Sequence, residues 1–292
     1  MMRWLSGLLL ALATSATATG PPPCPQYNPR PRLTGHVPAV LHELSGFASS
    51  RRHPGIFWAH NDSGNAPVLY ALRADGTVAA TLPLRGVSVR DPEDIAVGPC
   101  APGSEHSCIY LGDIGDSGAR RQSVQILKVV EPERLDDAPL VPAILPFRYP
   151  DGSHDAEALL VDPATARVFV ITKNLFSLGD VYRIDGLGGR EGGNAVRIRT
   201  LRATREFDST TTGADAHPSG TRLLLRTYTR AWELRSPDAR SFEDVLDAEP
   251  VAVPEASQPQ GEAISYTADG RGYLLGGEGT GSPLYLISCS EP

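Results

Sequence analysis

Acidic residues recur at the start of apolar segments in this chain, and they are the residues best suited to do chemistry. The segment DPEDIAV holds Asp91, Glu93 and Asp94 where an apolar run begins. The segments HDAEALLV and QGEAISY place Glu157 and Glu262 in the same way. An ionised carboxylate that loses its water needs a cation, a proton or hydrogen-bond donors in exchange. The recurrence therefore predicts a shared site for these acids.

The acids belong to an internal repeat. Five segments align at spacings of roughly 47 to 64 residues, a length that suits one four-stranded propeller blade. In each copy an acidic or hydroxyl residue stands at the entrance of the first strand. The aligned residues are Ser45, Glu93, Glu157, Asp215 and Glu262. The first strand of every propeller blade lines the central channel, so we expect these side chains to face one another across it.

The elements that must position them are strands. Helical periodicity is absent, and short runs rich in Val, Ile, Leu, Tyr and Phe alternate with turn residues. This pattern predicts an all-β, five-bladed β-propeller of four-stranded antiparallel blades. The last copy stops after its third strand at Cys289, so an N-terminal strand within LTGHVPAVLHE is expected to complete the last blade and close the ring. The alternative is six blades, with a degenerate one between Asp116 and Asp155.

The N-terminus has the composition of an export signal. Residues 1–20 combine a basic start, a short apolar run and a small-residue cleavage site, which predicts a secretory signal peptide. Residues 21–292 are then a single propeller domain, secreted or periplasmic, and expected to be a monomer. No later stretch is apolar and long enough to span a membrane. The net charge of -7, without a basic cluster, argues against a nucleic-acid partner.

Four cysteines in an exported chain predict two disulfides. Cys100 and Cys108 bracket a polar loop between two expected strands, and Cys24 and Cys289 stand at the two ends of the mature chain. A bridge between the ends would stabilise the fold by constraining the unfolded chain, with a large effect for so long a loop in the chain-entropy account. Free or differently paired thiols are the alternative.

A ring of one hydroxyl and four carboxylates has a specific electrostatic problem. Unpaired carboxylates about 4 Å apart repel by ~4 kcal/mol per pair at an effective dielectric constant of 20. Such a ring stays protonated, holds water or binds a cation. Ca²⁺ fits better than Mg²⁺ because its oxygen coordination is larger and less rigid. We therefore predict an axial Ca²⁺. The alternative is that each acid caps local amides or pairs with a neighbour such as Arg90.

The second strand of each blade runs antiparallel to the first and ends at the same opening. The residues expected to bind a ligand there are His60, Asn61, Lys173, Arg226, Tyr228 and Glu278. Acids beside two basic residues suit a small anionic, phosphate-bearing ligand. Asp62, Asp113 and Asp116 are candidates to orient an attacking water. They also stand in NDSG and GDIGDSG, which are ordinary Asx-turn sequences.

The entrance residues also carry a resemblance. Embedded in ELSGFAS, DPEDIAV, DAEALLV, TTGADAH and QGEAISY, they resemble the five-bladed propeller of calcium-activated nucleotidases, the apyrase family. That resemblance implies one oxygen ligand per blade around an axial Ca²⁺, with a hydroxyl residue in the family where this chain has Asp215. HNDSG, GDIGDSG and GEAISYTADGRGY are similar to segments of uncharacterised secreted bacterial propellers, loosely phytase-like and gluconolactonase-like.

Two classes of function remain open from the sequence. One is a calcium-dependent hydrolase of phosphoester, phosphoanhydride or lactone bonds. The other is a non-catalytic propeller with a structural calcium, whose mouth binds a ligand or a protein. Propellers host both classes, so fold alone does not choose between them.

Overall fold

The computed structural model describes residues 23–202 and 210–290. The predicted signal peptide, residues 1–20, lies outside the described residues. Within them the protein is all-β, and its helices are one turn each: η1 (Ala39–Leu41) and α1 (Phe242–Val245). No helix in this part of the chain is long and apolar enough to cross a membrane.

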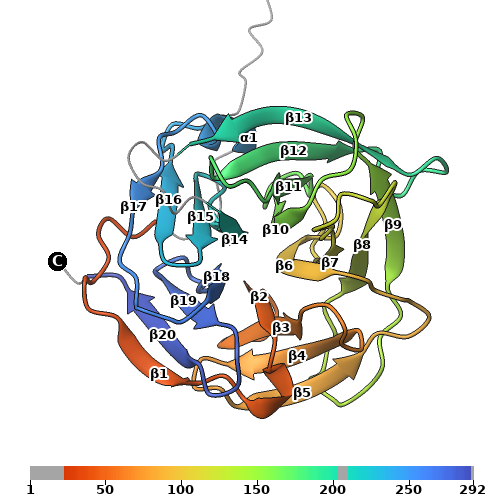
Figure 1. The fold of residues 1–292 in the computed structure, drawn as a ribbon. Helices are drawn as coiled ribbons and strands as arrows, with labels where there is room; N and C mark the ends of the chain where they lie inside the picture. Colours follow the sequence, from red (N-terminus) through yellow and green to blue (C-terminus); the bar gives the residue numbers. More distant parts are fainter. Residues whose placement is uncertain (1–22, 203–209, 291–292) are drawn as a thin grey trace, which may run out of the picture.

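The strands of the described chain form three sheets of four antiparallel strands and one sheet of eight (Figure 1). The eight-stranded sheet consists of two antiparallel runs of four, joined by a short parallel pairing of residues 193–194 with 147–148, and each run of four is called a group below. The first two groups are β2 (Leu44–Ser49), β3 (Ile56–Asn61), β4 (Val68–Arg73), β5 (Val78–Pro83), and β6 (Pro92–Pro99), β7 (Ser107–Asp113), β8 (Val124–Val130), β9 (Ala143–Arg148). The next two are β10 (Ala156–Val161), β11 (Val168–Thr172), β12 (Gly179–Asp185), β13 (Gly193–Leu201), and β14 (Thr211–Ala216), β15 (Arg222–Thr227), β16 (Ala231–Arg235), β17 (Val251–Ala252). The last is β18 (Gly261–Tyr266), β19 (Gly272–Gly277), β20 (Pro283–Ser288) and β1 (Arg32–His36).

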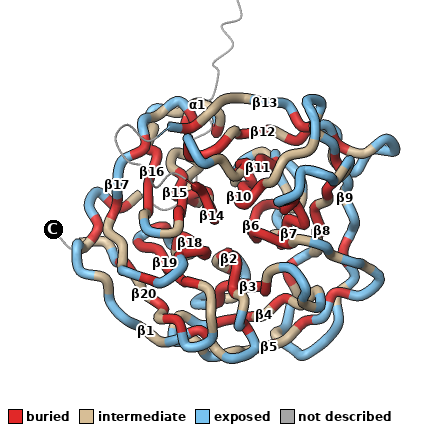
Figure 2. The backbone as a smooth tube through the Cα atoms, viewed as in Figure 1, coloured by how far each residue is buried: buried red, intermediate tan, exposed pale blue. Residues whose placement is uncertain are grey.

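The groups stand around a central axis in a propeller-like arrangement (Figure 1). The innermost strands β2, β6, β10, β14 and β18 surround the axis, and they are almost wholly buried, whereas the outer strands are largely exposed (Figure 2). Apolar side chains fill the space between neighbouring groups. For example, Trp58 and Leu82 of the first group pack with Ile109 and Leu111 of the second.

The N-terminal strand closes the arrangement as predicted. Strand β1 pairs antiparallel with β20, so a strand from the start of the chain completes the last group. Both predicted disulfides are present, Cys24–Cys289 at this closure and Cys100–Cys108 across the β6–β7 turn. Tyr27 adds a further tie, because its hydroxyl donates to Glu233 of β16 over 2.7 Å.

Candidate functional site

Each of the five inner strands carries a β-bulge at the same position. The pairing of each inner strand with its second strand shifts register and skips one residue, and the skipped residues are Ser45, Glu93, Glu157, Thr212 and Glu262. A bulge adds an unpaired residue and re-aims its side chain. The five bulges therefore present five oxygen-bearing side chains at one level of the inner strands.

The fourth member of this set is Thr212, and the prediction of Asp215 in the ring is wrong. The Asp215 carboxylate accepts hydrogen bonds from Ser265 Oγ (2.9 Å) and the Tyr266 amide (2.8 Å). It lines a second cavity at the other end of the inner strands, with Ser49 and Arg51. The sequence alignment matched Asp215 to the other entrance residues because it is acidic. In the structure the equivalent position is the bulge residue, Thr212. The available signal was a hydroxyl residue followed by glycine, since Thr212 precedes Gly213 as Ser45 precedes Gly46.

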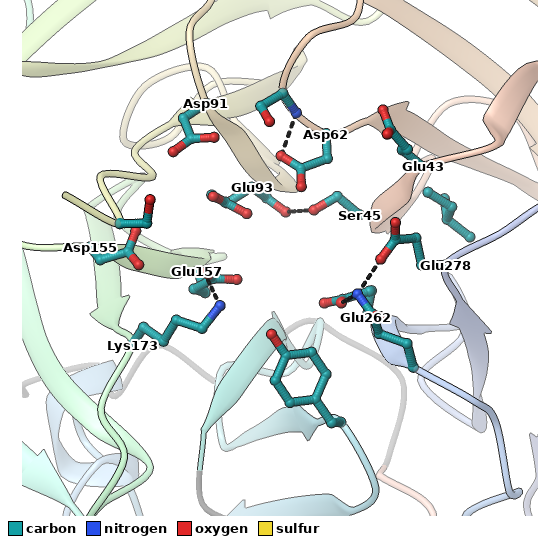
Figure 3. Close-up of a pocket in the computed structure, with 15 residues that line it drawn as sticks. Glu43, Ser45, Asp62, Asp91, Glu93, Asp155, Glu157, Lys173, Glu262 and Glu278 are labelled. Atoms are coloured by element: carbon teal, nitrogen blue, oxygen red, sulfur yellow. Dashed lines mark hydrogen bonds and ion pairs between the residues drawn. The ribbon is translucent and has the colours of Figure 1, made fainter.

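A polar cavity of about 240 Å³ lies over the bulge level at the mouth of the channel (Figure 3). Its carboxylates outnumber its basic groups eight to one: Glu43, Asp62, Asp91, Glu93, Asp155, Glu157, Glu262 and Glu278 against Lys173. Ser45, Tyr228 and Gln260 also line it. A cavity with this balance attracts cations and repels free anions.

Four of these residues form an upper tier that the sequence analysis missed. Glu43, Asp91, Asp155 and Gln260 each stand two residues before a bulge residue and line the same cavity. Side chains two apart along a strand point to the same side, which explains why the two tiers share one opening. The signal was readable in DPED and HDAE, where one acid precedes the next by two positions.

Among the described mouth acids, Glu93 is the buried one without a protein partner. Its side chain is buried, with 8% of its surface exposed. Among the described residues, no hydrogen bond or ion pair reaches its carboxylate. Burial and then the neighbouring Glu157 raise the pKa of Glu93 well above its ordinary value. Its oxygens lie within 4.8 Å of those of Asp62 and Asp91 on one side, and of Asp155 and Glu157 on the other.

The two other bulge glutamates have one neutralising partner each. Lys173 Nζ lies 2.6 Å from Glu157 Oε1, and Gln260 Nε2 donates to Glu262 Oε1 over 2.8 Å. Burial raises the pKa of Glu262 to about 8, despite the bond from Gln260. Burial raises the pKa of Glu157 as well, and Lys173 opposes that shift. Both acids resist ionisation unless more positive charge enters the cavity.

The two bulge hydroxyls join neighbouring inner strands. Ser45 Oγ donates to the Glu93 carbonyl over 2.5 Å, and Thr212 Oγ1 donates to the Gly261 carbonyl over 2.8 Å. A hydroxyl that donates its proton keeps two lone pairs. Both oxygens can therefore still act as ligands of a cation.

Four of the predicted second-strand residues lie where they were expected. Asp62, Lys173, Tyr228 and Glu278 line the mouth cavity. Burial, with Glu278 and Glu43 nearby, raises the pKa of Asp62. Lys173 also lies over the ring of Tyr228, 5.5 Å from its centre. These residues surround the bulge acids and form the rim that a ligand would touch.

His60 and Asn61 do not line the cavity. Asn61 ties the chain around β2, since its Nδ2 donates to the Val40 carbonyl (2.8 Å) and its Oδ1 accepts from the Glu43 amide (3.1 Å). His60 is buried, and this burial lowers its pKa to about 4. Both residues support the site from outside the cavity.

Asp113 and Asp116 lie outside the cavity as well. Asp113 faces Arg121 Nη1 at 2.9 Å, and also accepts hydrogen bonds from Gln125 Nε2 (2.7 Å) and the Asp91 amide (2.9 Å). Asp116 accepts from the Arg121 amide over 2.6 Å. Both carboxylates hold loops in place, as the Asx-turn alternative anticipated, and this leaves Asp62 as the one predicted catalytic aspartate in the mouth.

Arg226 is not part of the mouth cavity. Its side chain is fully buried behind β18, with its guanidinium 3.1 Å from Gln258 Oε1 and 3.9 Å from Glu255 Oε2. Gly261 lies so close to it that an added Cβ would come within 2.1 Å of Nη2. The predicted pair of basic residues is thus reduced to Lys173 in the cavity.

Comparisons with known proteins give no family. No family model and no curated protein matches the chain. Three similar solved structures are a candidate gluconolactonase (TM-score 0.45, 12% identity, covering 85% of this chain and 74% of that one), hydrazine synthase from Kuenenia stuttgartiensis (0.44, 11%, 87% and 97%) and a candidate 6-phosphogluconolactonase from Bacteroides uniformis (0.45, 13%, 83% and 66%). At such low identity, their names do not describe this chain.

Proposed function

We propose that the chain is a five-bladed propeller that binds Ca²⁺ on its axis, through Ser45, Glu93, Glu157, Thr212 and Glu262. The observation that carries this proposal is the Glu93 carboxylate, which is buried, turned into the cavity and without a protein partner among the described residues. Buried polar groups normally have partners, so one left without any points to a missing ligand. An all-oxygen set drawn from five strands suits the large, tolerant coordination of Ca²⁺.

Two observations support five blades in this proposal. The described chain has three sheets of four strands and one of eight that divides into two antiparallel runs of four, and each of the five innermost strands has its bulge at the equivalent residue. The segment between Asp116 and Asp155, where a sixth blade was conceivable, contributes β8 and β9 to the second group. Export fits the same proposal, because two disulfides suit an oxidising compartment.

We further propose that a small anionic ligand, with phosphate as the simplest form, binds at the mouth through the calcium. The cavity lining, eight acids against one base, offers such a ligand little attraction, and the basic residue there is already paired with Glu157. A bound divalent cation reverses this balance and offers positions for phosphate oxygens. Asp62, on the rim, is placed to orient a water if the protein hydrolyses the ligand. Without hydrolysis the same site is a calcium-dependent binding module.

Calorimetric titration with Ca²⁺ and with Mg²⁺ tests the metal. We expect Ca²⁺ to bind more tightly and to raise the melting temperature, because a ligand of the native state stabilises it by mass action. Glu93→Gln should abolish binding, and Glu105→Gln, in an exposed turn, should leave it unchanged. Wild-type protein that takes up no divalent cation would refute the proposal.

The same protein then serves to test the ligand. Inorganic phosphate and a panel of nucleotides and phosphoesters are titrated with Ca²⁺ and with chelator, and phosphate release is measured. Binding that needs Ca²⁺ supports the mouth site. Turnover that Asp62→Asn removes, while phosphate binding persists, supports the hydrolase over the binding module.

A further inference from the structure

A second acid lies on the axis, directly below the bulge level. Asp94 follows Glu93 in β6, and its side chain is buried, with 1% of its surface exposed. Its Oδ1 accepts from its own neighbour, the Ile95 amide, over 2.8 Å. Its Oδ2 accepts from the Leu159 amide of β10 (2.9 Å) and from the Ala214 amide of β14 (3.2 Å).

The three donors occupy equivalent positions. Ile95, Leu159 and Ala214 each stand two residues after the bulge residue of their own strand, which is Glu93, Glu157 or Thr212. Three inner strands thus direct the same backbone amide at one carboxylate. The site is an anion-binding arrangement of backbone N–H groups that the protein fills with its own side chain.

Strand β2 of the first group also lies close to the Asp94 carboxylate. A Cβ added at Gly46 of β2 would lie 2.8 Å from Asp94 Oδ1, 2.9 Å from His60 Nε2 and 3.0 Å from the Ile95 nitrogen. These separations are too short for carbon, so an alanine there would have to displace the side chains of Asp94 and His60. With β6, β10 and β14, the carboxylate touches or faces four of the five inner strands.

Side-chain bonds also join inner strands of different groups, two of them at the bulge level and one at the other end of the strands. Ser45 joins β2 to β6, Thr212 joins β14 to β18, and Ser265 Oγ accepts from the Ser49 amide (2.9 Å) to join β18 to β2. Asp94 supplies the remaining connections, from β6 to β10 and to β14. Together these bonds connect all five inner strands: β2, β6, β14 and β18 form a closed loop, and Asp94 ties β10 to it.

We propose that Asp94 is the positioning residue of the cation ring. By holding the amides of Ile95, Leu159 and Ala214, it sets how far Glu93, Glu157 and Thr212 stand from the axis. The bulge side chains are two residues from the amides it holds, so displacement of those amides moves the ligands. This inference rests on the proposed calcium site, and it adds a residue that does not itself coordinate the ion.

The test compares Asp94→Asn with Asp215→Asn. Asp215 is the matched control, because it is also an inner-strand aspartate that accepts a backbone amide, at the other end of the channel. The side-chain oxygen left by Asp94→Asn can still accept one set of bonds, but the new NH₂ group opposes the remaining N–H. We expect Asp94→Asn to weaken Ca²⁺ binding by about tenfold or more, as loss of the outer partners of metal ligands typically does.

The spectroscopic readout is the luminescence lifetime of Tb³⁺ bound in place of Ca²⁺. A displaced ligand is replaced by water, so Asp94→Asn should shorten the lifetime, whereas Asp215→Asn should change neither lifetime nor affinity. Gly46→Ala is the second variant if Asp94→Asn does not fold; it keeps the carboxyl group and pushes it aside, with the same expected result.

The outcomes separate the two proposals. If wild-type protein binds no cation, the calcium site fails and the positioning role falls with it. If wild-type protein binds Ca²⁺ and Tb³⁺ but Asp94→Asn keeps wild-type affinity and lifetime, the calcium site stands and the role of Asp94 is overturned. An equal loss of affinity in Asp215→Asn would also overturn it, since the effect would then be general destabilisation.

Discussion

Two buried glutamates at opposite ends of the sheets differ in the number of hydrogen bonds that their carboxylates accept. Glu131, at the end of β8, is 2% exposed, and Glu93, at the mouth, is 8% exposed. Glu131 accepts from Ser50 Oγ (2.6 Å), Trp58 Nε1 (2.7 Å), the Arg51 amide (3.2 Å) and Ser107 Oγ. The Glu93 carboxylate accepts none within the described chain.

The contrast separates an acid held by the protein from an acid that, in the proposed function, binds the ion. A fully hydrogen-bonded carboxylate stabilises the turn that surrounds it, here the turn between β2 and β3. A carboxylate without donors stabilises nothing in the metal-free protein, because burial favours its neutral form. Burial and charge therefore do not identify a binding acid. The absence of protein donors around a buried carboxylate is the criterion on which the proposed calcium site rests.

The largest expected effect comes from the same substitution at both glutamates. Glu131→Gln should lower the free energy of unfolding by about 3 kcal/mol, because its NH₂ group would face donors and leave buried groups unsatisfied. Glu93→Gln should change the calcium-free value by about 1 kcal/mol or less, since the raised pKa keeps this carboxyl protonated at neutral pH. Urea unfolding in chelator measures both. Equal destabilisation by the two variants would contradict the comparison.

The next effect is a pH dependence that calcium removes. The pKa of Glu262 rises from 4.5 to about 8 on folding, so the native state binds more protons than the unfolded state between these values. Stability in chelator should then fall as pH rises, by about 2 kcal/mol between pH 6.5 and 8.5 from Glu262 alone. Calcium should flatten this slope and bind more tightly at higher pH, because it displaces protons.

Two groups outside the mouth cavity do not disturb this comparison. His60, with its pKa lowered to about 4, loses stability mainly as pH falls below about 6.5, so it contributes little above that value. Asp215, with its pKa raised to about 7, contributes equally with and without calcium because it lies at the other end of the channel. Melting curves with parallel pH slopes in calcium and in chelator would show that the mouth acids hold no ion.

The sequence predicted the fold more fully than the site, for physical reasons. Strand and turn patterns are local, so the all-β class, the closing strand and the disulfides were accessible. Glu93, Glu157 and Glu262 were found because the acids recur in register with the repeat. Thr212 was missed because a bulge is set by pairing with β15 and has no fixed residue type.

The remaining errors concern the direction of side chains. The sequence analysis correctly predicted that β7 ends at this opening. The Asp113 side chain, however, points away from the cavity and contacts Arg121. Arg226 turns behind β18 in the same way. Asp94 was given no role of its own, because the amides of β10 and β14 that hold it are distant in sequence. Contacts of this range leave no local pattern to read.

The smallest expected effect concerns the basic residue in the mouth. Lys173 occupies Glu157 Oε1 at 2.6 Å and adds a positive charge that competes with an incoming cation. Lys173→Met should therefore tighten Ca²⁺ binding by about threefold, a modest gain because the half-buried ammonium is partly screened by solvent. The same variant should weaken calcium-dependent phosphate binding, since it removes a charge that attracts the anion. Tighter Ca²⁺ binding together with weaker phosphate binding, measured in one calorimetric series, would support the contrast between the mouth acids and Glu131 at the other end of the sheets. Weaker calcium binding instead would mean that Lys173 orders Glu157 for the ion, and Glu157 would then belong with Glu131 among the acids that depend on protein donors.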